Sequence, residues 1–422
     1  MPQQSRPLRI LYAAGPGNVL GTYHHWVNNE DDPLQISVTY SNQFYDVCRS
    51  LGAEGYIISS FPHKAFVQDG QFTIEHRPKQ FSGASGVLYH LSQILYGLQL
   101  VISAIQWRAD VVVVADGTTH WFVLSLLTYF GISVVPSLHC VLWRKYRPQK
   151  KIERLLNQLS RRLFTRSASI LVVSKDVAAQ VQHVMGDAKH PFIREFHPFY
   201  RKDAFSKVRR PKLQTPFQAL FIGRVEESKG VFDLLQVAKR FAAENRRDIQ
   251  FHFCGLGSAL EPLQQAVKAA GLESSMIFHQ YCDKAQLQEQ LNQSHVVVVP
   301  TTTTFVEGFN KVVAEGILTG RPVITSAVCP ALSYVRSGAV EVQPDNVQEY
   351  GDAILKLRDD SSFYKEKVQG CLQVQDQFYD ASTSWGNQLR AILLNLKTRS
   401  EAAQPVFLKK QTAQPLVEPI KR

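Results

Sequence analysis

The chain has 422 residues, 45% of them hydrophobic and 20% charged, which is typical of a globular protein and excludes a disordered or fibrous chain. This length is too great for one ordinary hydrophobic core, so two domains are expected. The net charge of +11 favours anionic partners, namely phosphate esters, anionic lipid head groups or nucleic acid, without choosing among them.

The cysteine pattern and the N-terminus bear on the cell compartment. The six cysteines include no C-x-x-C pair and no neighbouring histidine cluster, so the sequence does not predict a structural zinc site. Cysteines scattered in apolar runs are typical of reduced core residues. The first apolar run ends before Gly15 and is too short for a signal-peptide core. We therefore expect a cytoplasmic protein.

The first half contains short apolar runs separated by helical patterns. The runs are 9–14, 55–60, 110–116, 133–137 and 169–174. Nearly continuous Val and Ile predict parallel strands that are buried on both faces, and the helices between them predict β-α-β crossovers. The loop after the first run, GPGNVLG, has its third glycine one position late for G-x-G-x-x-G, which argues against a nicotinamide cofactor.

Two longer apolar stretches raise the question of a membrane span. Residues 86–105 include His90, Gln93 and Gln99, which make the stretch polar for a span. Residues 120–140 are interrupted by Gly131 and Pro136, which predicts a helix followed by a buried strand. We expect neither stretch to cross a bilayer.

A basic amphipathic helix is predicted at 152–164. Its leucines and Ile152 fall at helical spacing, and the surrounding segment 144–166 carries nine basic residues and one acidic residue, Glu153. One interpretation is a surface helix whose apolar stripe packs on the core. The other is a helix that rests on an anionic membrane. The two are compatible, and they leave a peripheral membrane location open.

The second half repeats the alternation of strands and helices. A proline-bearing basic segment without periodicity, centred on 201–215, predicts a linker. After it, apolar runs at 219–223, 249–255, 295–300, 322–326 and 339–343 predict a second parallel sheet. A helix is predicted at 384–397, and the polar, proline-bearing tail after it is predicted to be disordered.

Residues 300–326 combine a strand end, a glycine turn and a helix that begins at about Asn310. The unpaired N–H groups and positive dipole end of such a helix suit a diphosphate, and Gly308 allows a ligand to come close to the backbone. Glu307 and Glu315 are eight residues apart, so on a helix they would not face one atom. We therefore expect two different roles for them.

The segment EGFNKVVAE resembles the E-x7-E signature of retaining glycosyltransferase family 4, whose members have the GT-B fold. Further segments resemble the motifs of this family in the same order: 220–230, 253–263, 277–287 and 321–326. The resemblance covers 217–357 well and the first half only in outline. It implies an α/β fold in which two Rossmann-like domains with parallel sheets face a central cleft.

This resemblance divides the chain. It implies an acceptor-side domain at 1–200, a linker at 201–215 and a domain that binds the nucleotide-sugar at 216–375. Residues 376–398 would form a helix that packs back toward the first domain, and 399–422 would be a disordered tail.

The resemblance also implies roles for the charged residues. Arg224 and Lys229 match the basic pair that neutralises the donor diphosphate in place of a metal, whereas outside the motif they would be ordinary solvated charges. Glu307 matches the residue that binds the donor sugar, and Glu315 matches the one that holds the ribose. His139, in SLHC, matches the active-site histidine, although a lone histidine after a strand is usually a core residue.

The remaining expected contacts are uncharged. The N–H groups of Gly308 and Phe309 are expected at sugar and phosphate, and the other predicted donor contacts are Asn310, Gly223, Gly255, Gly257 and Tyr281. Asn310 stands where the family commonly has glycine, which leaves the identity of the sugar open. Gly15 and Gly17 are expected to face the cleft on the acceptor and diphosphate side. His24, His25 and Trp26 either line that side or lie on the surface.

The implied reaction is retaining, metal-independent transfer of a hexosyl group from a nucleoside-diphosphate sugar to a sugar or lipid-linked acceptor, without a cofactor. No carboxylate nucleophile is assigned, so we expect substitution on one face of the sugar. Alternatives are another GT-B enzyme, such as a nucleotide-sugar epimerase or a phosphorylase, and a catalytically silent protein that binds sugar-nucleotide or membrane. Nucleic-acid binding has no motif in its favour.

Overall fold

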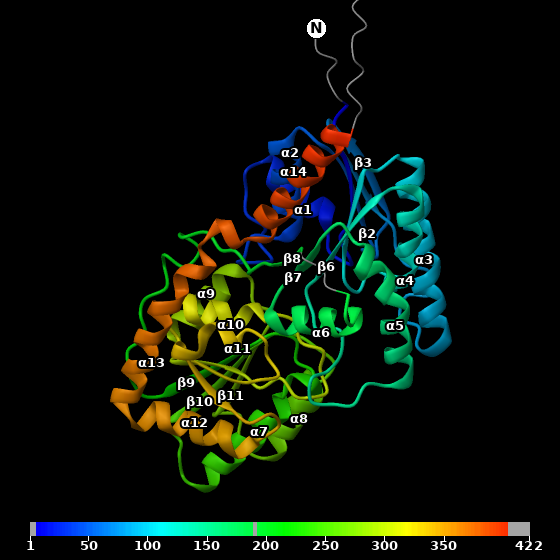
Figure 1. The fold of residues 1–422 in the computed structure, drawn as a ribbon. Helices are drawn as coiled ribbons and strands as arrows, with labels where there is room; N and C mark the ends of the chain where they lie inside the picture. Colours follow the sequence, from blue (N-terminus) through cyan, green and yellow to red (C-terminus); the bar gives the residue numbers. More distant parts are fainter. Residues whose placement is uncertain (1–5, 189–191, 404–422) are drawn as a thin grey trace, which may run out of the picture.

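The computed structural model describes residues 6–188 and 192–403, which form two α/β lobes, each built on a parallel sheet (Figure 1). The eight-stranded sheet has the order β3-β4-β2-β1-β5-β6-β7-β8 and is parallel except for β3. Its strands are β1 (Arg9–Ala13), β2 (Glu54–Ser59), β3 (Ala65–Asp69), β4 (Phe72–His76), β5 (Val111–Ala115), β6 (Ser133–Leu138), β7 (Ile170–Val172) and β8 (Ile193–Glu195).

The second sheet is parallel throughout and has the order β11-β10-β9-β12-β13-β14. Its strands are β9 (Phe217–Ile222), β10 (Ile249–Cys254), β11 (Met276–Gln280), β12 (Val296–Val299), β13 (Val323–Ser326) and β14 (Ala339–Val342). All ten predicted strands are present, which confirms the expected fold class of two parallel-sheet lobes.

Helices cover both sheets (Figure 1). In the N-terminal lobe they are α1 (Val19–Val27), α2 (Tyr40–Leu51), α3 (Gly86–Gln106), α4 (Trp121–Leu124), the 3-10 turn η1 (Ser125–Phe130), α5 (Lys151–Arg166) and α6 (Lys175–Met185). In the C-terminal lobe they are η2 (Glu227–Lys229), α7 (Val231–Ala243), α8 (Leu260–Ala269), α9 (Lys284–Gln293), α10 (Lys311–Leu318), α11 (Leu332–Val335), α12 (Val347–Asp359) and α13 (Ser361–Val374).

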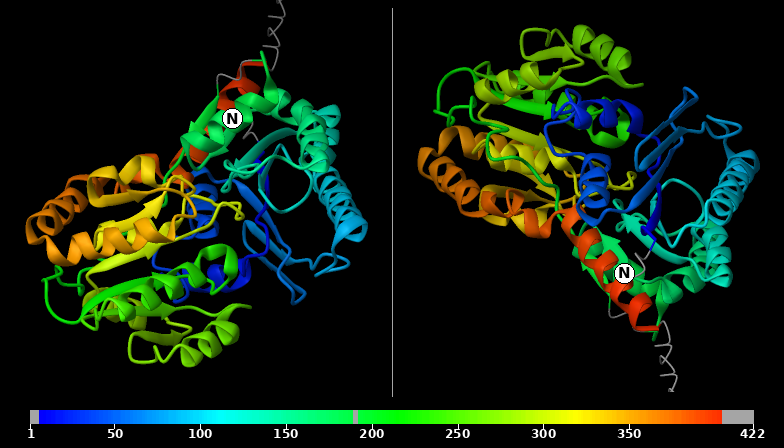
Figure 2. Two further views of the ribbon diagram at one scale, coloured as in Figure 1. Left: turned by 90° about the horizontal axis from the view of Figure 1, so that it is seen from below. Right: turned by 90° about the horizontal axis from the view of Figure 1, so that it is seen from above.

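The last helix, α14 (Trp385–Ala403), leaves the C-terminal lobe and lies along the N-terminal one (Figure 2). The indole N–H of Trp385 donates to Ser137 Oγ at 2.8 Å, and the N–H of Gly386 donates to Gln43 Oε1 at 2.8 Å. These two bonds fix α14 to β6 and α2. Residues 201–216 form no helix or strand between the lobes, and most of the tail that was predicted to be disordered, 404–422, lies outside the described residues.

Both apolar stretches fold as elements of the N-terminal lobe. Residues 121–138 form α4, η1 and β6, which confirms the predicted helix followed by a strand. By length and hydropathy, α3 is the one helix in the described ranges that could cross a membrane. Its Ser92, Gln93 and Tyr96 are nevertheless buried against the sheet, while Val87, with 83% of its surface exposed, and Ile102 face outward.

The basic helix α5 is present, but its apolar stripe is divided. Leu163 is buried, whereas Ile152, Leu155 and Leu159 are between 42% and 49% exposed. The interpretation that the whole stripe packs on the core is therefore wrong for these three residues. They lie on the outer flank where α3, α4 and α5 run side by side (Figure 1).

Candidate functional site

Glu307 lies at the seam between the lobes and is surrounded by hydrogen-bond donors. Its Oε2 accepts from Lys229 Nζ at 2.8 Å, from the Thr301 hydroxyl at 2.9 Å and from Asn310 Nδ2 at 3.1 Å. Its Oε1 accepts from the N–H of Gly308 at 3.1 Å. Only 5% of Glu307 is exposed, so this carboxylate is fixed in position and neutralised by a nearly buried cation.

The two predicted phosphate cations share one aromatic ring. Lys229 Nζ lies 3.7 Å from the ring centroid of Phe305, and the guanidinium carbon of Arg224 lies 5.7 Å from it. Arg224 also pairs with Glu226 at 2.7 Å, but its side chain is 63% exposed and able to swing toward a ligand. Phe305 was missed by the sequence analysis, and its only signal is an aromatic residue in the loop between β12 and α10.

Asn310 begins α10 in the left-handed region, with φ of 63°. This conformation explains the departure from the glycine that is common in the family, because asparagine tolerates it better than other residues with a side chain. The side chain then adds the hydrogen bond to Glu307 that glycine lacks. The predicted start of the helix at about Asn310 is confirmed, and Glu307 lies in the preceding turn.

Glu315 lies in a separate, small pocket, as expected for a different role. The Tyr200 hydroxyl donates to its Oε1 at 3.4 Å, and burial raises its pKa to about 7, against the lowering effects of Lys311 and Tyr200. The pocket beside it has a volume of 110 Å³ and is closed on the N-terminal side by residues 34–37. Lys311 Nζ donates to Gln35 Oε1 at 3.0 Å across the lobes.

Several predicted glycines serve close approaches of the backbone. A Cβ on Gly255 would lie 1.8 Å from the carbonyl oxygen of Gly223, and one on Gly257 would lie 2.3 Å from that of Val225. A Cβ on Gly308 would lie 2.5 Å from the carbonyl oxygen of His139, so the contact that requires glycine here is with the other lobe. The glycine motif therefore shapes the loops themselves.

The seam between the lobes is a backbone contact. Gly308 and Cys140 form an isolated antiparallel bridge, and the N–H of Val141 donates to the carbonyl of Glu307 at 3.1 Å. Asp116 supports this segment by accepting the N–H groups of His139 and Cys140 at 3.0 and 2.7 Å. Asp116 was not predicted, although it directly follows a buried strand, where parallel sheets collect functional side chains.

The ring of His139 is enclosed by aromatic residues. Its Nε2 lies 3.0 Å from Ser137 Oγ, its Nδ1 is buried without a hydrogen-bond partner among the described residues, and its centroid is 4.3 Å from Tyr40 and 5.2 Å from Phe196. Burial lowers the pKa of His139 to about 3, so the ring is neutral at physiological pH.

The other predicted residues have local contacts of their own. Phe309 is a core side chain, 3% exposed, packed on Tyr334, while Tyr281 follows β11 and is 51% exposed. The carbonyls of Gly15 and Gly17 bond the chain after β2: Gly15 accepts the N–H of Ser60 at 2.7 Å, and Gly17 accepts the Ser59 hydroxyl.

Neither alternative given for residues 24–26 holds for the tryptophan. Trp26 is buried, and its indole N–H donates to Asp46 at 2.8 Å, so it belongs to the core. His25 pairs with Glu30 on the surface.

An interlobe cavity of 280 Å³ opens beside Glu307. Its walls combine Trp143 and Tyr146 from the N-terminal lobe with Phe305 and Pro330 from the C-terminal lobe. Arg147, from the basic segment, donates to Thr303 Oγ1 at 2.9 Å at this seam. Arg147 therefore joins the lobes and does not belong to a membrane surface.

Comparisons with known proteins indicate the family of the chain. A family model described as Glycosyltransferase Family 4 matches residues 41–193, and one described as Glycosyl transferases group 1 matches residues 203–369. The chain is 25% identical over 238 residues to a 2-deoxystreptamine N-acetyl-D-glucosaminyltransferase from Streptomyces fradiae. That match spans 53% of this chain and 56% of the relative.

Solved structures share the whole fold. HepE from Anabaena, in complex with UDP, superposes with a TM-score of 0.64 at 15% identity and covers 92% of this chain and 100% of that one. Sucrose-phosphate synthase from Thermosynechococcus elongatus gives a TM-score of 0.68 at 14% identity, with coverages of 94% and 99%. With both family matches and a shared two-lobe architecture, the chain belongs to the family 4, or group 1, glycosyltransferases of the GT-B fold.

Proposed function

We propose that the protein is a retaining, metal-independent glycosyltransferase that moves a hexosyl group from a nucleoside-diphosphate sugar to an acceptor hydroxyl. The observation that carries the proposal is the ion pair of Glu307 and Lys229, placed before the N-terminus of α10 and against the opposite lobe. A carboxylate and a cation held together in this way present one group for sugar hydroxyls and one for phosphate.

Donor binding would divide this ion pair. The diphosphate would bind Lys229 and the exposed Arg224. It would also accept the N–H groups at the start of α10, which have no partner within the helix. Glu307 would then accept hydroxyl groups of the donor sugar. The cations would stabilise the negative charge that grows on the leaving diphosphate, and this supports chemistry without a metal.

The bond changes occur on one face of the sugar. The bond from the anomeric carbon to the β-phosphate oxygen breaks, and the acceptor oxygen forms its bond on the same side. The departing phosphate oxygen accepts the acceptor's proton, so atoms and charge balance. Asp116 is engaged by two backbone N–H groups and acts as a positioning residue for the 139–141 segment, not as a nucleophile.

Nucleotide entry requires movement of the N-terminal lobe. The cavity beside Glu315 has a volume of 110 Å³, whereas ligand sites usually have about 300 Å³ or more. Residues 34–37 would therefore withdraw before the ribose reaches Glu315, and the lobes would close again around the donor.

The test is turnover with a panel of labelled UDP-, GDP- and ADP-sugars, beginning with N-acetylglucosaminyl donors because the curated relative is named for that group. We expect label in an acceptor with wild-type protein and a loss of about 10²- to 10³-fold with Lys229→Met. The matched control is Lys239→Met, which changes an exposed lysine on α7 and should leave the transfer rate unchanged.

The panel also discriminates between functions. Interconversion of the donor without transfer would support an epimerase, and binding without turnover would support a silent sugar-nucleotide protein. Either result would refute the transferase proposal.

We also propose a cytoplasmic location at an anionic membrane surface, through the outer flank of α5 and α3. The exposed Leu155 and Leu159 stand among the cations of α5, of which Arg162 lies over the ring of Tyr129. Apolar side chains with flanking cations suit an anionic bilayer. Arg144 and Lys145 do not contribute, because they pair with Glu153 and Asp176.

Flotation with vesicles tests this location. Wild-type protein should float with phosphatidylglycerol vesicles at low salt and lose this binding at high salt. Leu155→Gln combined with Leu159→Gln should weaken binding, whereas Phe66→Gln on the edge strand β3, also an exposed apolar residue, should not. Equal flotation with neutral vesicles would contradict the electrostatic account.

A further inference from the structure

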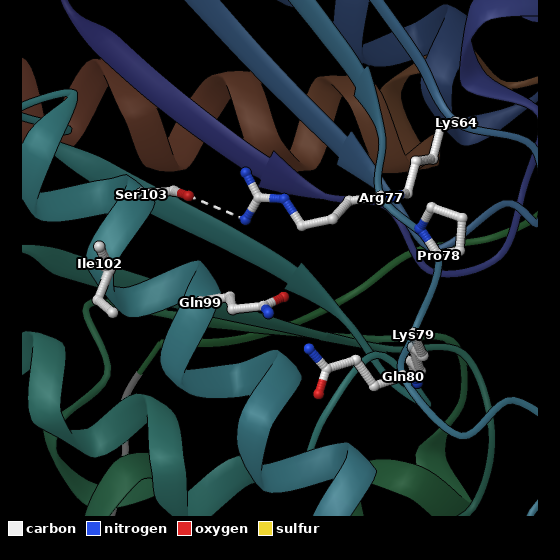
Figure 3. Close-up of a pocket in the computed structure, with 8 residues that line it drawn as sticks. All are labelled: Lys64, Arg77, Pro78, Lys79, Gln80, Gln99, Ile102 and Ser103. Atoms are coloured by element: carbon white, nitrogen blue, oxygen red, sulfur yellow. Dashed lines mark hydrogen bonds between the residues drawn. The ribbon is translucent and has the colours of Figure 1, made fainter.

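A second cavity lies in the N-terminal lobe, away from the Glu307 ion pair. It has a volume of 520 Å³ and lies between the chain that follows β4 and the side of α3 (Figure 3). The polar side chains on its walls are Lys64, Arg77, Lys79, Gln80, Gln99 and Ser103, and none of its lining residues in the described chain is acidic.

The three cations of this cavity differ in their partners. Arg77 is paired: its Nε and Nη2 donate to the two carboxylate oxygens of Glu75, each at 2.7 Å, and its Nη1 donates to Ser103 Oγ at 2.9 Å. The Arg77–Glu75 pair is charge-neutral, and the bond from Arg77 to Ser103 joins the chain after β4 to α3 (Figure 3). Lys64 and Lys79, by contrast, have no carboxylate within ion-pair distance among the described residues.

Lys79 is the more unusual of the two. Its Nζ donates to Gln93 Oε1 at 3.0 Å and to the carbonyl of Gly117 at 2.8 Å. Its Nζ also lies 5.5 Å from the ring centroid of Tyr96. An ammonium group has three N–H donors and two of them make these hydrogen bonds, so a ligand could accept the third. Burial lowers the pKa of Lys79 to about 8, because its partners are neutral dipoles and no anion compensates its charge. A bound anion would supply that compensation.

The cavity is connected to the transfer site through a single loop. Gly117, which Lys79 holds, follows Asp116, and Asp116 binds the segment that bridges to Gly308. Lys79 belongs to the chain after β4, but its ammonium group reaches Gly117 beyond the end of β5, the strand next to β6 in the sheet. A group bound at Lys79 would therefore lie beside the loop that supports the 139–141 segment, where a part of the acceptor other than its reacting hydroxyl can bind.

We infer that the Lys64–Lys79 cavity is a phosphate subsite, which binds a phosphate ester carried by the acceptor. This inference deepens the proposed function and rests on it for the word acceptor, but the anion site itself stands on the charges and partners above. The source of the phosphate is either a lipid head group or a soluble phosphorylated sugar. Ile102 lines the cavity, and 52% of its surface is exposed on the side of the outer flank. If the phosphate belongs to a lipid, the lipid chain would leave the cavity past Ile102.

Binding tests the subsite without any need for turnover. Glycerol 3-phosphate is titrated calorimetrically into protein that is saturated with a nucleoside diphosphate, so that Lys229 and Arg224 are occupied. We expect one remaining site, weakened about 10- to 100-fold by Lys79→Met and to a smaller degree by Lys64→Met. Lys79→Arg should retain most of the affinity, and Lys239→Met should change nothing.

The thermal midpoint of each variant is measured alongside, because Lys79→Met leaves Gln93 and Gly117 without their donor. If Lys79→Met fails to fold, the exposed Lys64→Met still decides the question. The inference is overturned if nucleotide-saturated wild-type protein binds no glycerol 3-phosphate, or if both methionine variants bind it as wild type does. Failure of sugar transfer leaves this result unaffected, so the two failures are distinguishable.

A comparison of vesicle binding identifies the source of the phosphate. Vesicles that contain phosphatidic acid are compared with vesicles of phosphatidylcholine alone, in wild type and in Lys79→Met. Loss of the phosphatidic acid preference in Lys79→Met assigns the subsite to a lipid phosphate. Binding of glycerol 3-phosphate with equal vesicle binding in the two proteins assigns it to a soluble phosphorylated acceptor.

Discussion

Asn310 carries both a backbone constraint and a side-chain contact, and substitution can separate the two. Its φ of 63° is easy for glycine but costs alanine about 1 kcal/mol. We therefore expect the free energy of unfolding of Asn310→Ala to be lower than that of Asn310→Gly by about that amount. Both variants lose the bond to Glu307, so both should show a similar change in donor KM.

Urea denaturation and steady-state kinetics check this prediction. Equal stability of the two variants would mean that the left-handed conformation does not constrain this position. An unchanged donor KM in both would mean that the amide of Asn310 is irrelevant to the Glu307 carboxylate.

The raised pKa of Glu315 predicts that donor binding depends on pH. Burial raises the pKa of its carboxyl to about 7, so the carboxylate that we propose to accept ribose hydroxyls is present above that pH and is lost below it. The affinity for the nucleotide-sugar should fall as the pH drops below about 7, by at most tenfold per pH unit, because one proton is involved. His139 should not contribute, since its pKa of about 3 keeps it neutral across this range.

Calorimetric titration of the nucleotide-sugar at several pH values measures this effect, because its diphosphate does not titrate there. Glu315→Gln should bind more weakly and with no pH dependence. A wild-type affinity that stays constant down to the ordinary carboxyl pKa would contradict the role assigned to burial.

At the scale of elements, the glycines of the β9 and β10 loops are predicted to matter for stability more than for ligand contact. A Cβ on Gly255 would lie 1.8 Å from the Gly223 carbonyl oxygen, so Gly255→Ala should lower the free energy of unfolding by about 3 kcal/mol. Gly271 has positive φ but no atom within 4 Å of such a Cβ, and Gly271→Ala should cost only about 1 kcal/mol.

Gly17→Ala is the control for the other two glycine variants, because it adds neither a clash nor backbone strain. Nothing lies within 4 Å of a Cβ on Gly17, so the stability should stay within about 0.5 kcal/mol of wild type. Denaturation curves for the three alanine variants check the order. A Gly255→Ala protein as stable as Gly17→Ala would contradict the packing argument.

Patterns in the sequence predicted elements well where both faces of a strand are buried. The valine runs of β5 and β12 are recognisable because a short run of β-branched apolar residues is typical of a strand that is buried on both faces. The hairpin of β3 and β4 was missed because β3 is a short edge strand that is mostly exposed and has no buried apolar run. The outward part of the α5 stripe was also unpredictable, because periodicity identifies a face of a helix but not its neighbour.

The sequence likewise predicted some features of the candidate site and missed others. The order of motifs indicated Glu307, Lys229 and Arg224, but not that Glu307 and Lys229 pair directly before any donor arrives. Phe305 and Asp116 were missed because their roles depend on residues that are distant in sequence. The acceptor half was hardly predictable, since the N-terminal lobe matches the family only in outline and the cations of its cavity come from separate loops.

At the scale of the whole molecule, charged contacts hold the lobes together on the nucleotide side. Asp31 pairs with Arg201 at 2.9 Å and with Lys284 at 3.1 Å, and all three side chains are partly exposed. Each such pair contributes about 0.2–1 kcal/mol and is screened by salt. These contacts hold the nearby residues 34–37 over the Glu315 pocket. We therefore expect Asp31→Asn to speed nucleotide association a few-fold.

Stopped-flow measurement of association at low and high salt checks this prediction. Salt should speed association with wild-type protein and have less effect on Asp31→Asn. Identical rates and salt dependences in the two proteins would mean that these ion pairs do not limit entry.

The central claim is that Glu307 and Lys229 together bind a nucleotide-sugar for transfer. Its most direct test follows labelled sugar from donor to acceptor with wild type, Glu307→Gln and Lys229→Met, and reads the anomeric configuration of the product by NMR. We predict a product with the configuration of the donor and a loss of about 10²- to 10³-fold in kcat/KM in each variant, with Lys239→Met active. Wild-type turnover in both variants, or a product of inverted configuration, would contradict the account.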